Sequence, residues 1–163
     1  IEIKSSKERL NYNNMIDNGI CFACGDDSIS YKFVEDFIMN LEETYGVEII
    51  QIGYDRYNCR STAQKLEAAG YEVVEVKQHS SILHAPTKLL KEYILHRTFK
   101  YEDNRLLEIN FSNARCTEDT NKNKYVNKKK SAGKVDMVVS TIIAVCLMQA
   151  EQLDNSDCTI QVV

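Results

Sequence analysis

Apolar side chains recur with the period of an α-helix in several stretches of the chain. Between residues 33 and 45 they follow one helix face, and Gly46 stands where a left-handed residue usually ends a helix. The range 61–69 begins with a serine and a threonine that can cap a helix, and a glycine follows it. Pro86 suits the first turn of a further helix, where its missing N–H costs nothing. The range 135–149 is apolar almost all round, which predicts a helix buried on most sides.

Short β-prone stretches separate these predicted helices. The ranges 47–54 and 71–76 are rich in β-branched residues and flank the helix at 61–69. A strand, a helix and a strand within about thirty residues predict a right-handed crossover and a parallel pair of strands. Residues 19–25 are an apolar run between two glycines, which predicts another strand.

Two further ranges, 105–111 and 124–128, are expected to form a hairpin around a polar loop rich in asparagine and lysine. The pattern as a whole predicts one α/β domain with a partly parallel sheet over residues 1–150. A polar C-terminal tail, 151–163, is expected to fray. We interpret the opening at Ile1, which resembles neither a tag nor a targeting segment, as a cut within a longer protein.

Size and composition exclude several classes of protein. The 163 residues fit one domain, and 44% hydrophobic with 27% charged residues are typical of a folded domain. No apolar run approaches the ~18 residues that a membrane span needs. The six cysteines are too few for a disulfide scaffold and no signal peptide precedes them, which favours the reducing cytoplasm.

Asp55 ends the buried strand predicted at 47–54. In open α/β sheets ligands collect beyond the carboxyl ends of the strands, so this carboxylate can point into a binding crevice. The alternative is an aspartate that only forms a turn or caps a helix, and spacing alone favours that alternative.

Asp136 lies at the start of the most apolar helix of the chain. A carboxylate among valines is costly to bury unless it is paired or coordinates a cation. The alternative is an exposed acid in the first turn, where it favours the helix dipole. Composition leaves the two interpretations of Asp136 about equal.

The stretch 115–134 is the electrostatic anomaly of the chain. Seven basic residues stand against two acidic ones there, a local charge of about +5 in a chain whose net charge is −4. Clustered lysines can neutralise phosphates, although a run of charge is often only a solvated loop. Lys128, Lys129, Lys130 and Lys134, which directly precede the helix predicted at 135–149, are candidate phosphate contacts.

Two other motifs that would indicate a function are absent or weak in this sequence. Cys21 and Cys24 would diverge on a strand and no second pair follows them, which argues against a zinc site. No phosphate-binding glycine loop occurs, so the chain is not by itself an ATPase.

Taken in order, IGYDRYNCRS, HAPTKLLKE and the segment from NFSNARCTED to KKKSAGKVDM resemble the C-terminal nuclease domain of tailed-phage (and prophage) terminase large subunits. The resemblance runs from about Tyr12 to Met148. Its most specific elements are the GYDR strand end, the spacing of Gln78, Pro86 and Lys88, Asn113 with Asp119, and the closing KKSAGKVD.

This resemblance implies an RNase H-like fold, in which a mixed sheet flanked by helices carries a cluster of acidic residues that bind Mg²⁺ or Mn²⁺. By position, Asp55 matches the second acidic residue of that cluster and Asp136 the last. The first lies on an early strand that, in the family, precedes the point where this chain begins. We therefore expect an N-terminally truncated nuclease domain that lacks its first strand.

The implied function is metal-dependent cutting of concatemeric double-stranded DNA during phage packaging in the host cytoplasm. Implied partners are an upstream ATPase domain, a portal and a small terminase subunit, with no membrane. Two alternatives stay open: another RNase H-like nuclease of the resolvase or transposase type, and a non-catalytic module that grips or docks DNA.

Overall fold

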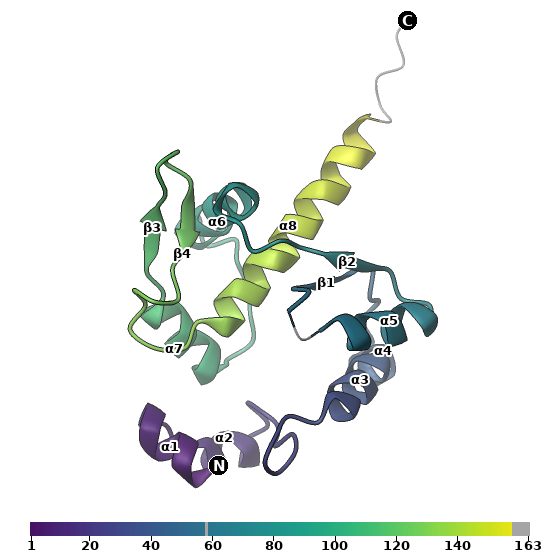
Figure 1. Cartoon of the computed structure of the whole chain (residues 1–163), viewed down its shortest axis with the longest axis vertical. Coiled ribbons are helices and arrows are strands. Elements are labelled where there is room, and N and C mark those ends of the chain that lie inside the picture. The colour runs from purple at the N-terminus through teal and green to yellow at the C-terminus, as the bar shows by residue number, and fades with distance from the viewer. Residues whose placement is uncertain (58, 158–163) are drawn as a thin grey trace, which may run out of the picture.

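The computed structural model describes residues 1–57 and 59–157, which form helices around two short sheets (Figure 1). The helices are α1 (Glu2–Glu8), α2 (Tyr12–Asp17), α3 (Tyr31–Met39), α4 (Leu41–Tyr45), α5 (Arg60–Ala68), α6 (Ser80–Leu95), α7 (Arg105–Asn113) and α8 (Asp136–Asp157). The strands are β1 (Ile52–Tyr54), β2 (Val73–Glu75), β3 (Cys116–Glu118) and β4 (Lys124–Val126). No helix of the described residues is long and apolar enough to cross a membrane.

Helix α8 is the centre of the packing. It runs between the β1–β2 pair on one side and α6 with the β3–β4 hairpin on the other (Figure 1). Val138, Val139 and Ile142 are buried on it, and Val135 directly before it and Leu90 of α6 belong to the same core. This burial confirms the prediction of a helix that is covered on most sides.

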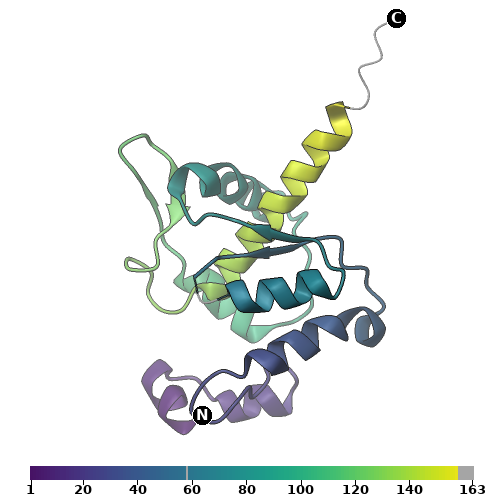
Figure 2. The same cartoon turned by 45° about the vertical axis from the view of Figure 1, so that its right-hand side comes forward.

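The predicted parallel pair of strands and the helix between them are confirmed. Strands β1 and β2 pair in parallel, with Ile52 opposite Val73, and α5 connects them. In the turned view α5 lies below the two strands, and α3 lies beneath α5 (Figure 2). Buried Glu35 of α3 accepts hydrogen bonds from Thr62 and Lys65 of α5 at 2.9 Å each, which joins these two helices.

The strands differ from the expected single mixed sheet. Among the described residues they form two separate sheets, one parallel and one antiparallel. The predicted strand at 19–25 is wrong, because its backbone bonds locally: Ile20 N–H donates to the end of α2, and the Cys24 carbonyl accepts from Ser30 N–H. The strand predicted at 47–54 is paired only over its last part, Ile52–Tyr54.

The predicted hairpin exists but its first strand was misplaced. The range 105–111 belongs to helix α7, whose start is capped by the Asn104 side chain accepting from Leu107 N–H at 3.0 Å. The strand that pairs with β4 is β3, in antiparallel register with Cys116 opposite Val126.

Three helix boundaries also differ from those predicted from the sequence. Helix α6 begins at Ser80 after a His79 cap, so Pro86 lies inside the helix and not in its first turn. The helix predicted at 33–45 is divided at Asn40 into α3 and α4, and it ends at Gly46 with a positive φ of 64°, as expected. Helix α8 continues through Asp157, past the predicted end at 149, and the remaining tail lies outside the described residues.

Candidate functional site

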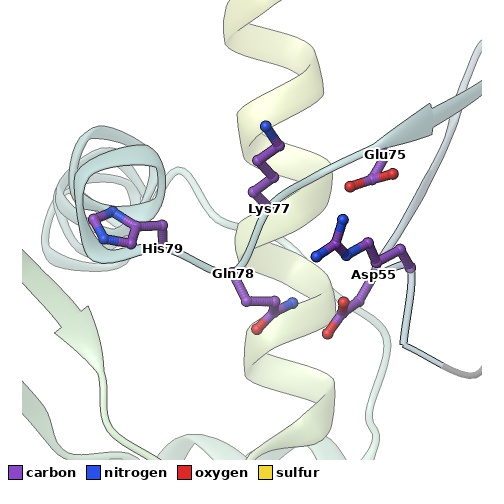
Figure 3. A pocket seen from close by; sticks show the side chains of 6 residues that line it. Asp55, Glu75, Lys77, Gln78 and His79 are labelled. Carbon is purple, nitrogen blue, oxygen red and sulfur yellow. The ribbon is translucent and has the colours of Figure 1, made fainter.

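Asp55 follows β1 directly and lies beside the carboxyl end of β2. A hollow of about 350 Å³ opens there, in front of α8 (Figure 3). Its lining residues are Asp55, Arg56, Glu75, Lys77, Gln78 and His79. Asp55 and Gln78 lie close to each other in this hollow, whereas Lys77 points away from it and His79 turns toward α6 (Figure 3). The crevice predicted beyond the strand ends is therefore present.

The Asp55 side chain also shapes its own loop. Its Oδ1 accepts a hydrogen bond from Tyr57 N–H at 3.2 Å, a local turn of the kind that aspartate often forms. This bond occupies one carboxylate oxygen. The turn-forming interpretation and the crevice interpretation are thus both compatible with the observed position.

Gly53 brings β1 unusually close to α8. A Cβ at this position would lie 2.5 Å from Ile143 Cγ2 and 3.0 Å from Leu147 Cδ1, so a side chain has no room there. Asp55 is two residues beyond this crossing, or ~7 Å along an extended chain. Asp136 is seven residues before Ile143, which is ~10 Å along the helix axis. Asp55 and Asp136 therefore lie on two elements that cross at Gly53, and Asp136 is not among the residues that line the hollow beside Asp55.

Asp136 is the first residue of α8 and its side chain is 64% exposed. Lys128 Nζ lies 3.1 Å from its Oδ1, which forms an ion pair on the surface. Asp136 is thus an exposed acid of the first helical turn and not a carboxylate buried among valines, which decides its environment but not its role. In that position the carboxylate also interacts favourably with the helix dipole.

Two asparagines of α7 hold the start of α8 in place. Asn110 is only 3% exposed, and its Oδ1 accepts a hydrogen bond from Met137 N–H at 3.3 Å. Asn113 Nδ2 donates to the Lys134 carbonyl at 3.2 Å. Because the first N–H groups of a helix lack partners within it, Asn110 acts as a cap from another element. Asn110 was not predicted as a site residue, since nothing in the local sequence distinguishes it from a residue on a helix surface.

The predicted basic residues adjoin this helix start. Lys128, Lys129 and Lys130 form a turn after Asn127, whose Oδ1 accepts from the N–H groups of the last two lysines. All three side chains and that of Lys134 are exposed. Apart from the bond between Lys128 and Asp136, no ion pair is formed by these lysines within the described residues.

Asp119 is held by hydrogen bonds in the loop of the β3–β4 hairpin. Its carboxylate accepts hydrogen bonds from the Ser80 hydroxyl at 2.6 Å, from the Asn123 amide and from two backbone N–H groups. These bonds, that of Ser80 above all, hold the pKa of Asp119 far below its usual range. The bond to Ser80 ties the hairpin to the start of α6.

Comparison with known proteins identifies the family. The sequence model described as the terminase large subunit endonuclease domain matches residues 2–152. The chain belongs to this family. Its structure is similar to the crystal structure of the large terminase of bacteriophage HK97, with a TM-score of 0.80 and 20% sequence identity. That match covers 90% of this chain and 30% of the HK97 chain, and no curated protein matches.

Asp55 and Asp136 carry the type of oxygen donor that divalent ions bind. Asp55 and Asp136 are carboxylates, the ligands that Mg²⁺ and Mn²⁺ prefer. Within residues 1–57 and 59–157 no three His, Cys, Asp or Glu side chains are grouped closely enough to hold an ion. Mg²⁺ commonly uses one or two carboxylates and completes its shell with water and substrate phosphates. The two aspartates fit that pattern in their chemistry.

Proposed function

We propose that this domain is a divalent-metal-dependent endonuclease with an RNase H-like fold, which cuts concatemeric double-stranded DNA during phage genome packaging. The observation that carries the proposal is the family match over nearly the whole chain. The chain covers about a third of the HK97 terminase, so the ATPase domain, portal and small subunit as partners, and the host cytoplasm as location, are also proposals.

Asp55 and Asp136 are the metal ligands in this proposal. A bound Mg²⁺ or Mn²⁺ would supply Lewis-acid stabilisation of the phosphodiester and a nucleophilic water near neutral pH. The chain's own contribution is positioning. Gly53 lets β1 approach α8, and Asn110 caps the helix that carries Asp136, so both carboxylates stand on well-packed elements.

The lysines next to Asp136 are the proposed DNA contacts. Lys129, Lys130 and Lys134 are exposed and free of acidic partners in the described structure, so their charge is available to phosphates. Phosphate contacts position a duplex but carry no sequence code, so we expect little sequence preference from them.

Metal binding tests the ligand assignment. We would titrate the chain and its Asp55→Asn and Asp136→Asn variants with Mn²⁺ and follow free Mn²⁺ by electron paramagnetic resonance. Asp103→Asn, an exposed acid in the loop before α7, is the matched control. We expect Asp55→Asn and Asp136→Asn each to weaken Mn²⁺ binding while the control does not. Unchanged Mn²⁺ binding in both variants would show that the ligands are elsewhere.

DNA binding tests the lysines separately. The affinity for a short duplex is measured over a range of salt concentrations for Lys134→Ala and for Lys32→Ala, an exposed lysine on α3. Each lost phosphate contact lowers the slope of log K against log salt by about 0.9, so we expect that change for Lys134→Ala alone. Equal slopes for the two variants would exclude Lys134 as a DNA contact.

A further inference from the structure

A second surface is formed by α6 and the β3–β4 hairpin, which lie on the other side of α8 from β1 and β2 (Figure 1). A groove of about 790 Å³ runs between α6, the β3–β4 hairpin and α8. Its lining includes the apolar residues Leu90, Ile94, Leu95, Phe111, Val126, Val138 and Ile142. A neighbouring hollow of about 400 Å³ shares Ile94 and Phe111 with the groove and extends it to Tyr101.

The apolar lining is substantially exposed at the carboxyl end of α6. Ile94 is 42% exposed and Leu95 is 66% exposed, and Tyr101 in the adjoining hollow is 52% exposed. Single exposed apolar residues are ordinary, but residues gathered along two connected hollows mark a surface suited to binding another molecule.

The rim of this surface carries an excess of positive charge. Its three glutamates are already paired with basic residues: Glu92 with Lys88 at 4.0 Å, Glu118 with Lys124 at 3.3 Å, and Glu108 with Arg105 at 2.9 Å. Four rim cations have no acidic partner within 4 Å among the described residues: Lys91, Arg97, Lys100 and Lys122. This local excess stands in a chain whose net charge is −4, so it is not a consequence of overall composition.

We propose that this groove docks an amphipathic helix of a protein partner, with apolar side chains on one face and acidic side chains beside it. Apolar side chains of the helix would cover Ile94 and Leu95, as in other helix-in-groove complexes. Its carboxylates would meet the four unpaired cations, which favours acidic partners over basic ones. A DNA backbone could use the cations but would leave the apolar floor exposed. The proposal does not depend on the nuclease assignment.

Synthetic peptides test the charge and the apolar face separately. The probe is an 18-residue (about five turns) amphipathic helix of leucine and glutamate with a fluorescent label, and binding is followed by anisotropy. One matched peptide has lysine in place of glutamate, and another has alanine in place of leucine. We expect only the acidic, leucine-containing peptide to bind. Failure of that peptide to bind, or equal binding of the lysine peptide, would overturn the proposal.

Variants of the domain locate the binding surface. Leu95→Ser removes an exposed apolar side chain from the groove, and Ile3→Ser is its control because Ile3 is 87% exposed on α1. Lys91→Ala is compared with Lys32→Ala, and exposed ion pairs predict about a two- to fivefold loss of peptide affinity for Lys91→Ala alone. Equal effects of the groove and control substitutions would overturn the location.

A labelled duplex distinguishes a nucleic-acid surface from a protein-docking surface. If the peptide binds the groove, Leu95→Ser weakens peptide binding and leaves duplex binding unchanged. If the duplex competes with the peptide and Lys91→Ala weakens the duplex as strongly, the groove is a DNA-binding surface and the proposal is wrong.

Discussion

Replacement of Gly53 by alanine tests the close approach of β1 and α8, on which the position of Asp55 depends. The new Cβ would lie 2.5 Å from Ile143 Cγ2 and 3.0 Å from Leu147 Cδ1. Carbon atoms pack best at about 3.5–4.0 Å, so the Ile143 side chain, or β1 and α8 themselves, would have to shift by about an ångström. Overpacking of this kind costs about 1–3 kcal/mol. Removal of a strand glycine returns roughly 0.5–1 kcal/mol, so the expected net loss is about 1–2 kcal/mol.

Urea unfolding followed by circular dichroism measures this loss as a lower midpoint at an unchanged m-value. For a domain of this size, 1 kcal/mol corresponds to a fall in Tm of about 2–4 °C. No other described glycine offers an unstrained position with free space, so the control is a double-mutant cycle with Ile143→Ala. Removing the Ile143 side chain relieves the clash, so the double variant should lose less stability than the two single losses combined. A stable Gly53→Ala variant, or additive losses, would refute this account of the crossing.

Two further predictions concern stability. The Thr87 hydroxyl is buried without a hydrogen-bond partner in the described structure, so Thr87→Val should raise the free energy of unfolding by about 1 kcal/mol. Thr62→Val is its opposite control, because that hydroxyl donates to Glu35 and its loss should destabilise; equal effects in urea unfolding would contradict both assignments. The lowered pKa of Asp119 means that its contribution is complete above the ordinary carboxyl pKa of about 3.9 and is lost as pH falls toward the folded-state value. The stability difference between the wild type and Asp119→Asn should therefore be largest at neutral pH and shrink below about pH 4, and a difference independent of pH would refute it.

Features that depend on neighbouring residues were predictable from the sequence. The run that is apolar almost all round marked α8, the glycine at position 46 ended the helix before it, and the alternation of strand, helix and strand anticipated the parallel β1–β2 pair. The order of short motifs also identified the terminase nuclease family, which the match over residues 2–152 confirms. Asp55 at the end of a strand could be placed beside a crevice because strand order determines where carboxyl ends meet.

Features that depend on contacts between distant residues were decided only by the tertiary structure. Local pattern does not reveal that Asn110 caps α8, that Lys128 pairs with Asp136, or that Ser80 binds Asp119 across 39 residues. The start of α6 and the first hairpin strand were misplaced for a different reason, because local caps were overlooked: His79 accepts from Ser81 N–H before α6, and Asn104 accepts from Leu107 N–H before α7. Periodicity and capping act within a few residues, whereas side chains far apart in sequence meet only when the core has packed. The residue types of the candidate site were therefore readable in the sequence, whereas their exposure and their hydrogen-bond partners were not.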